Sequence, residues 1–301
     1  MAEPIVDRVL KDRKWLDKPA GAVQKWVQGT FKALGPLGRP AKDLLHGQKL
    51  LHHPLHPALT DVPLGAWGAA VVADFISITT NQHLLPRNAG TVALAIGVVV
   101  ALGAVASGYT DYSETWGLER RTAFVHGLTM SLTFTLMSVS LLFRLVGVDA
   151  LYGPAVGLST AGLFLAGAGM YLGGHVVYRF GTQINRWAFV EGGPTRAFVD
   201  AGRSEDFPEG EMKKVEAKGM PFLMVRLRGQ MYGILNVCSH AGGPLADGEL
   251  QGGIVECPWH GSRFSVVTGE CHGSPATFPQ PCLEVTEQDG AVQVKLADVL
   301  H

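Results

Sequence analysis

The sequence predicts a membrane protein in two parts, a four-helix transmembrane bundle followed by a soluble antiparallel β domain. Residues 61–177 are strongly apolar and poor in charge, whereas the chain beyond residue 202 has the composition of a soluble protein. The apolar part contains four stretches long enough to cross a bilayer as helices, which takes about 20 residues each. From Glu211 onward, short alternating runs such as FLMVRLR and AVQVKL are separated by Gly, Pro and Asp, as expected of strands.

Composition limits the function classes. The 301-residue chain has a net charge of −1, so its overall charge does not predict a nucleic-acid partner. Its 4 cysteines are too few for a disulfide scaffold. The first 50 residues lack an apolar core and a small-residue cleavage site, so we expect no secretory signal in them.

We expect four segments along the chain. They are an amphipathic N-terminal segment at the membrane surface (1–50), a four-helix transmembrane domain (51–180), a linker (181–207) and a β domain (208–299).

Apolar residues of the N-terminal segment recur at helical spacing. They are Val23, Trp26, Val27, Phe31 and Leu34, and Lys25 and Lys32 lie off their common face. This pattern is typical of a helix that lies in the membrane surface and contacts lipid. The alternative is a helix that packs on its own protein.

The four expected spans are Val62–Thr80, Asn88–Tyr109, Thr122–Val146 and Tyr152–Tyr178. Small residues at four-residue steps allow such helices to approach closely in lipid, which predicts a compact bundle. The first span carries Asp74, which either pairs with a partner in the bundle or marks a span that ends early. The segment before the first span holds ten Lys or Arg residues, and the loop after it only Arg87. This bias predicts that the N-terminus and the β domain face the cytoplasm.

Two close Cys–His pairs occur in the expected β domain. Cys238 and His240 form the first pair, and Cys257 and His260 the second, with residues 241–256 between them. Two cysteines and two histidines suit either zinc or a [2Fe–2S] cluster. Zinc fingers usually separate cysteine pairs from histidine pairs, whereas each pair here mixes them. A cluster with two thiolates on one iron and two imidazoles on the other requires this mixture.

The residues around the two pairs resemble the Rieske ferredoxin family. The matching motifs are CSHAGGPL at 238–245, CPWHGSRFSVVTGE at 257–270 and PATFPQP at 275–281, and the resemblance covers about 90 residues. It implies a [2Fe–2S] cluster that transfers one electron at a time. Cys238 and Cys257 would hold the buried iron, and His240 and His260 the outer iron, near the surface where electrons enter and leave.

The chain also departs from one branch of this family. High-potential Rieske proteins of quinol-oxidising complexes carry an additional cysteine in each loop, and Gly243 and Trp259 stand at those places here. Ser262 can still donate a hydrogen bond to the cluster, but Phe264 has no hydroxyl with which to do so. Because hydrogen bonds to sulfur stabilise the reduced cluster, we expect a reduction potential in the lower part of the Rieske range.

Polar residues of the membrane half predict a second site. Several approach the same end of the expected bundle, and polar groups at membrane depth are costly and usually functional. The candidates are His53, His56, Asp61, Asp111, His126 and His175. Such a set suits a b-type haem, another transition metal or a quinone. The alternative is interfacial histidines that cap helices, contact headgroups or hydrogen-bond between helices.

A second resemblance covers about residues 50 to 180. The segment HPLHPALTDVPLGAW, with a later helix histidine, is similar to a family of four-helix membrane domains of unknown function (DUF2231-like). The matching residues are His53, Pro54, His56, Pro57 and His126. This resemblance supplies a domain boundary but no activity.

The sequence favours a membrane-anchored electron-transfer protein that passes single electrons between a soluble partner and a membrane-side donor or acceptor. The soluble partner would be a reductase or an oxygenase-type protein, because the chain shows no flavin or nicotinamide fingerprint. One alternative is a small membrane oxidoreductase with a haem, metal or quinone site in the bundle. Another is a protein that senses redox state, or only anchors the domain, without turnover.

Overall fold

The computed structural model describes residues 4–49, 51–189, 192–194 and 197–297. It divides into two compact units, Met1–Ala41 with Pro54–Gly181, and Lys42–His53 with Thr182–His301. The first unit is helical and the second consists mainly of antiparallel strands, so the predicted fold class is confirmed.

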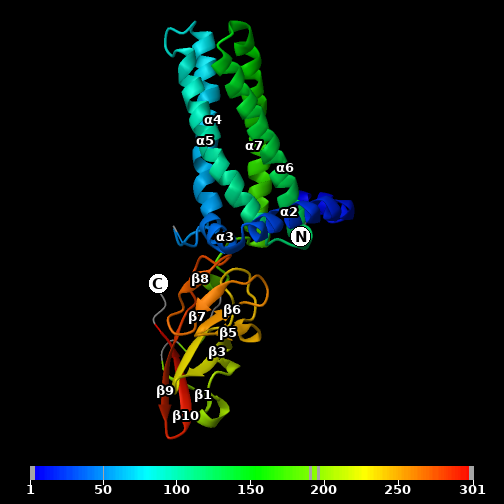
Figure 1. The fold of residues 1–301 in the computed structure, drawn as a ribbon. Helices are drawn as coiled ribbons and strands as arrows, with labels where there is room; N and C mark the ends of the chain where they lie inside the picture. Colours follow the sequence, from blue (N-terminus) through cyan, green and yellow to red (C-terminus); the bar gives the residue numbers. More distant parts are fainter. Residues whose placement is uncertain (1–3, 50, 190–191, 195–196, 298–301) are drawn as a thin grey trace. The chain divides into compact units, whose positions relative to one another are not determined.

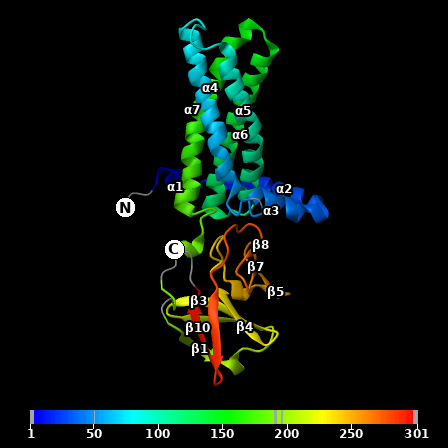
Figure 2. The same ribbon diagram turned by 90° about the vertical axis from the view of Figure 1, so that its left-hand side faces the viewer.

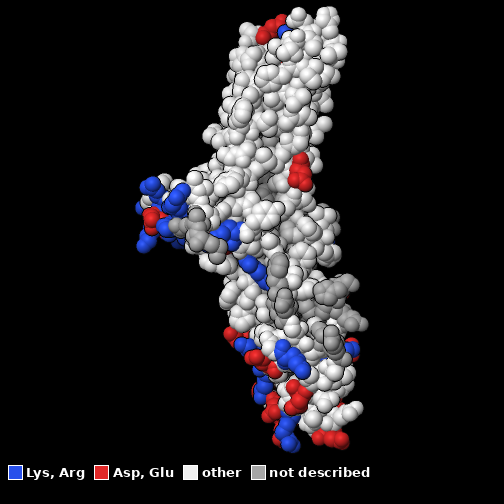
Figure 3. Space-filling view, turned by 180° about the vertical axis from the view of Figure 1, so that it is seen from behind, with Lys and Arg blue, Asp and Glu red and all other residues white. Residues whose placement is uncertain are grey.

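Four long helices form the body of the first unit (Figures 1 and 2). They are α4 (Leu55–Thr79), α5 (Arg87–Tyr112), α6 (Gly117–Val146) and α7 (Asp149–Phe180). Within the described residues, these four are long and apolar enough to cross a membrane. Figure 3 shows few charged atoms along the visible face of the bundle, as a lipid-facing surface requires.

The order of the helices around the bundle follows from their contacts. α4 pairs with α5, and α6 with α7; α5 also packs on α6, and α4 on α7. α4 and α6 therefore lie diagonally across the bundle. Small residues permit the close packing: a Cβ added to Gly97 of α5 would lie 2.5 Å from the buried Trp67 ring of α4.

A buried ion pair joins the two diagonal helices. Asp74 of α4 accepts two hydrogen bonds from Arg144 of α6, at 2.8 and 2.6 Å, and both side chains are at most 1% exposed. The Tyr152 hydroxyl of α7 also donates to Asp74, and the Ser159 hydroxyl of α7 accepts from Arg144. Of the two expectations for Asp74, pairing within the bundle is confirmed, and a membrane-depth charge is thereby compensated.

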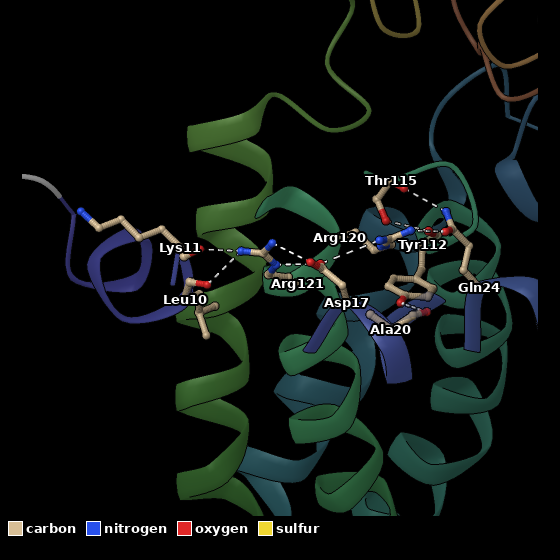
Figure 4. A network of polar contacts seen from close by, with 9 residues as sticks. All are labelled: Leu10, Lys11, Asp17, Ala20, Gln24, Tyr112, Thr115, Arg120 and Arg121. Atoms are coloured by element: carbon tan, nitrogen blue, oxygen red, sulfur yellow. Dashed lines mark hydrogen bonds and ion pairs between the residues drawn. The ribbon is translucent and has the colours of Figure 1, made fainter. Parts of the chain in front are cut away.

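Short N-terminal helices lie across one end of the bundle. They are α1 (Ile5–Leu10), η1 (Lys14–Leu16), α2 (Asp17–Ala33) and η2 (Gly35–Leu37), followed by α3 (Gly38–His46). Figure 4 shows Arg121 of α6 donating two 2.7 Å hydrogen bonds to Asp17, and the Tyr112 hydroxyl donating to the Ala20 carbonyl at 2.6 Å. The Arg121 hydrogen bonds lower the pKa of Asp17.

The amphipathic helix predicted in this segment is α2. Val27 is buried against the rest of the unit, whereas Trp26 remains 69% exposed and Leu34 45% exposed. One side of α2 therefore packs on its own protein, and other apolar side chains remain exposed beside it. The placement of this segment at the membrane surface stays a prediction.

The described residues of the second unit form three small antiparallel sheets. Their strand orders are β1-β10-β9, β2-β3-β4 and β5-β6-β7-β8. The strands are β1 (Val199–Arg203), β2 (Met212–Ala217), β3 (Met220–Leu227), β4 (Gln230–Leu235), β5 (Glu249–Gln251), β6 (Ile254–Glu256), β7 (Arg263–Ser265), β8 (Cys271–Gly273), β9 (Leu283–Gln288) and β10 (Ala291–Leu296). Three 3-10 helices complete the unit: η3 (Arg186–Phe189), η4 (Ser204–Asp206) and η5 (Leu245–Asp247).

The segment expected as a linker, residues 181–207, contributes to this unit. β1 pairs with β10, and the Trp187 ring nitrogen donates to the Pro279 carbonyl at 2.8 Å. The sequence VDAGR does not alternate, and the pairing register shifts between Asp200 and Gly202, so periodicity gave no strand signal here.

Candidate metal centre

The two Cys–His pairs lie in two loops of the same construction. The first loop follows β4, and the second joins β6 to β7. The Cys238 amide donates to the Gly243 carbonyl at 2.9 Å, and the Cys257 amide donates to the Ser262 carbonyl at 2.8 Å. Each cysteine carbonyl also accepts a hydrogen bond from the amide four residues later, which closes each loop at a glycine.

Those two glycines, Gly242 and Gly261, have φ angles of 82° and 72°. Residues with a Cβ rarely adopt this left-handed conformation, so the two turns favour glycine. The glycines of the sequence motifs therefore have a geometric role: they turn each loop so that its cysteine and its histidine reach the same side.

The two cysteine side chains meet inside the domain core. Cys238 is 1% exposed and Cys257 3%, and they pack with buried residues such as Leu245, Val255 and Phe264. The Cys238 thiol donates a hydrogen bond to the Cys257 sulfur, which lowers the pKa of Cys257 and raises that of Cys238. Their sulfurs are thus close enough to bind one metal ion together.

Backbone amides also point at the two sulfurs. Cys238 accepts from the amides of His240 and Ala241, and Cys257 from those of Trp259 and His260, and each of these hydrogen bonds lowers the pKa of its cysteine. Hydrogen bonds of this kind favour the thiolate, which is the form that binds iron.

The two histidines form a second pair beside the cysteines. The ring centroids of His240 and His260 are 5.0 Å apart, with the ring planes at 85°. Burial, followed by the proximity of His260, lowers the pKa of His240 well below its ordinary value, so this ring is neutral at physiological pH. Its Nδ1 atom is buried without a hydrogen-bond partner, although buried polar groups normally have one.

These observations fit a [2Fe–2S] cluster. Among the described residues, no three His, Cys, Asp or Glu side chains converge as a mononuclear site requires. A thiol pair beside an imidazole pair instead provides two ligands for each of two irons. The missing hydrogen-bond partner of His240 Nδ1 is explained if this atom binds an iron, because a neutral imidazole nitrogen is a metal ligand.

The residues expected around the cluster lie next to these pairs. A Cβ added to Gly243 would lie 2.8 Å from the Cys257 sulfur and 3.1 Å from the Trp259 ring, so a larger residue does not fit there. Trp259 itself is 53% exposed. The buried Ser262 hydroxyl accepts a hydrogen bond from the Ala276 amide at 3.1 Å, which leaves its own proton available for donation.

Sequence reasoning missed a segment that joins this unit from far away in the chain. Residues 42–53 belong to it: Asp43 accepts from the Ser274 amide at 3.0 Å, and the Gln48 side chain donates to the Cys271 carbonyl at 2.7 Å. His46 is fully buried, and its electrostatic interaction with His240 contributes to lowering the pKa of His240. No local pattern marks this contact, because its partners are more than 200 positions away.

The six residues expected to form a membrane-side site separate into different environments. His53 lies in the second unit, with its ring centroid 6.1 Å from that of Phe278. His175 donates to Asp7 at 2.8 Å, Asp61 is exposed, and Asp111 is buried near the end of α5.

Only two of the six lie ring to ring. The His56 and His126 centroids are 6.4 Å apart. Among the described residues, no three His, Cys, Asp or Glu of this set are grouped as a metal site requires.

Comparisons with known proteins identify both parts of the chain. The Rieske [2Fe-2S] domain family matches residues 197–284, and the family described as predicted membrane protein (DUF2231) matches residues 52–186. The ferredoxin component of the naphthalene 1,2-dioxygenase/salicylate 5-hydroxylase systems of Ralstonia sp is 35% identical over 102 residues, or 34% of this chain and 98% of the relative. Ferredoxin CarAc of Metapseudomonas resinovorans is 35% identical over 92 residues, or 30% of this chain and 86% of the relative.

A solved structure gives a similar match. The ferredoxin of carbazole 1,9a-dioxygenase from Nocardioides aromaticivorans IC177 is 27% identical, with a TM-score of 0.32, and the match covers 33% of this chain and 97% of that chain. Since the chain covers nearly all of the Ralstonia ferredoxin, its C-terminal part is a domain of the same kind. The protein is an electron-transfer protein with a [2Fe–2S] cluster, and it belongs to the Rieske [2Fe-2S] domain family.

Proposed function

We propose that this protein is a membrane-anchored Rieske electron carrier that passes single electrons between a soluble redox partner and a membrane-side donor or acceptor. The observation that carries the proposal is the buried cysteine pair beside the histidine pair, in a domain similar to ferredoxin components. Cys238 and Cys257 hold the inner iron, and His240 and His260 hold the outer iron.

The exposure of the ligands supports this assignment of the two irons. The cysteines are at most 3% exposed, whereas His260 is partly exposed and the neighbouring Trp259 is 53% exposed. Electrons then enter and leave on the histidine side of the cluster. A soluble partner docks over this face.

The soluble partner is a reductase or an oxygenase-type protein. Its class is inferred from the relatives, which are named as ferredoxin components of dioxygenase systems. The chain shows no flavin or nicotinamide fingerprint, so a separate protein supplies the electrons.

The helical unit anchors the carrier, with the N-terminus and the Rieske domain in the cytoplasm. Basic residues of the N-terminal segment, together with Arg120 and Arg121, lie at one end of the bundle. At the opposite end, Arg144 and Arg87 are each paired with an aspartate. The larger number of Lys and Arg residues therefore favours the N-terminal end as the cytoplasmic one.

Two variants, each with one added cysteine, test this orientation against the wild-type protein as the labelling background. Leu84→Cys lies in the turn between α4 and α5, where Leu84 is 74% exposed, and Trp15→Cys lies at the other end, where Trp15 is 69% exposed. In intact cells a membrane-impermeant maleimide should label the first and not the second. Labelling of Trp15→Cys alone would reverse the proposed orientation.

Electron transfer is tested with the full-length protein in lipid nanodiscs. A flavin-dependent ferredoxin reductase with NADH should bleach the visible absorption of the cluster, and an oxygenase component should restore it. The Cys257→Ser variant provides the control, because it lacks one thiolate ligand and should show neither change. A wild-type cluster that exchanges electrons with no soluble partner would contradict the proposed role.

A second candidate function is a small membrane oxidoreductase with a site for haem, another metal or a quinone inside the bundle. One observation favours it, the pairing of His56 with His126 between two helices that lie diagonally across the bundle.

A further inference from the structure

The sequences of α4 and α6 place matching polar residues at two levels of the bundle. His56 and Asp74 of α4 are separated by 18 positions, and so are His126 and Arg144 of α6. Eighteen residues complete about five helical turns, so each histidine lies on the same face as the charged residue of its helix. The Asp74–Arg144 ion pair shows that these two faces point at each other.

The two levels differ in one respect. Asp74 and Arg144 bond directly, whereas His56 and His126 approach without a hydrogen bond between them among the described residues, at a centroid separation of 6.4 Å. The ring planes are at 77°. The centre of the bundle is therefore closed by an ion pair at one level and holds two facing imidazoles at the other.

The Nδ1 atom of each imidazole hydrogen-bonds to a backbone carbonyl of a neighbouring helix. His56 Nδ1 lies 2.8 Å from the Ala104 carbonyl of α5, and His126 Nδ1 lies 2.8 Å from the Gly169 carbonyl of α7. A carbonyl only accepts, so Nδ1 carries the proton and, in a neutral ring, Nε2 has the free lone pair. A backbone carbonyl on the other ring nitrogen is also the usual support of a metal-bound histidine.

Glycines hold each ring in its place. One turn after each carbonyl stands a glycine, Gly108 on α5 and Gly173 on α7. A Cβ at Gly108 would lie 2.7 Å from the His56 ring, and one at Gly173 would lie 3.0 Å from the His126 ring. A larger side chain at either position would push the imidazole off its carbonyl.

We propose that His56 and His126 are the axial ligands of a haem bound inside the helical bundle. Two lone-pair nitrogens cannot hydrogen-bond to each other, whereas both can bind one metal ion placed between them. A bare metal ion needs more protein ligands than two, and no group of three His, Cys, Asp or Glu forms a metal site among the described residues. Haem iron brings its equatorial ligands with it and leaves two axial positions.

The separation and the surroundings agree with this assignment. Metal–imidazole bonds of about 2.0–2.1 Å place the centroids of two opposed imidazoles about 6.3 Å apart, and the observed separation is 6.4 Å. Neighbouring turns of α5 and α7 carry small buried residues, Ala101, Ala104 and Ala166. This proposal rests on the second candidate function and does not depend on the iron–sulfur cluster.

The test uses the full-length protein, purified in detergent from cells supplied with iron and a haem precursor. Reduced-minus-oxidised visible spectra and low-temperature EPR record haem and cluster separately in one sample, so either proposal can fail alone. We expect about one low-spin haem per chain. In His56→Ala and His126→Ala the haem content should fall at least tenfold, while His83→Ala, in the exposed turn at the other end, should keep it. Added imidazole should restore the low-spin signal of both variants, which separates a lost ligand from a lost fold.

Three results would overturn the proposal. The first is protein with a full Rieske signal that contains no haem and takes up no added haemin. The second is a haem whose spectrum is unchanged in both His56→Ala and His126→Ala. The third is a metal without porphyrin, or a quinone, found at a level that depends on these two histidines.

Discussion

Replacement of Ser262 by alanine should lower the reduction potential of the cluster. Ser262 is fully buried between the second ligand loop and β7, and its carbonyl accepts the Cys257 amide at 2.8 Å. Its hydroxyl already accepts from the Ala276 amide, so its proton is free to be donated to the cluster. The reduced cluster carries one more negative charge than the oxidised one, so a donated hydrogen bond stabilises the reduced form more.

The size of the effect follows from the strength of one such bond. A hydrogen bond to a charged group contributes about 1.5–3 kcal/mol, of which we assign about 1–2 kcal/mol to the difference between oxidation states. Since 59 mV corresponds to a tenfold change for a one-electron couple, the potential of Ser262→Ala should fall by roughly 45–90 mV. The orphaned Ala276 amide should also cost about 1–3 kcal/mol of stability.

An EPR-monitored redox titration measures the shift, and Ser265→Ala is the matched control. The Ser265 hydroxyl accepts from the amides of Val267 and Thr268 at 3.2 and 3.1 Å, so its loss affects a turn and not the ligand loops. Ser262→Thr keeps a hydroxyl and should keep the potential. Equal shifts in Ser262→Ala and Ser265→Ala, or none in either, would refute the reasoning.

Three further predictions concern other contacts of the two units. Gly243→Ala places a Cβ 2.8 Å from a ligand sulfur, so iron and sulfide per chain should fall by more than half; full occupancy would contradict the close fit. Asp74→Asn leaves a buried arginine uncompensated and should cost about 3–5 kcal/mol in thermal unfolding. Asp149→Asn removes an exposed pair and should cost at most about 1 kcal/mol; equal losses would contradict this difference. Burial alone would raise the pKa of Asp7, but its hydrogen bonds from Arg179 and His175 lower it. Its stabilisation should therefore be complete above pH ~3.8 and disappear as the pH falls below that value. In the wild-type protein the unfolding temperature should fall at acid pH as Asp7 is protonated, and in Asp7→Asn this part of the fall should be absent. An Asp7→Asn profile identical to that of the wild type would contradict the stabilising role of Asp7.

The sequence predicts those features that depend on composition or short spacing. Hydropathy alone locates the four long helices, because each contains a stretch that is long and apolar enough to cross a bilayer. The Cys–His loops are equally visible, since their glycines and ligands lie within a few residues of one another. The structure starts the helices earlier than the apolar runs suggest: α4 begins at Leu55 and not at Val62, because a helix extends beyond its apolar part.

Long-range contacts could not be predicted in this way. The hydrogen bonds from the Ser274 amide to Asp43 and from His175 to Asp7 join residues far apart in the sequence. Six polar residues approach one end of the expected bundle, but helix rotation decides which of them meet. Of the six, only His56 and His126 bring their rings into contact with each other.

The central claim is a [2Fe–2S] cluster held by Cys238, His240, Cys257 and His260, and pulsed EPR of the reduced full-length protein tests it most directly. The account predicts a spin-half signal with hyperfine couplings from two directly bound nitrogens, and loss of that signal in His240→Ala. A reduced cluster without nitrogen coupling, or protein that contains zinc and gives no signal, would contradict the account.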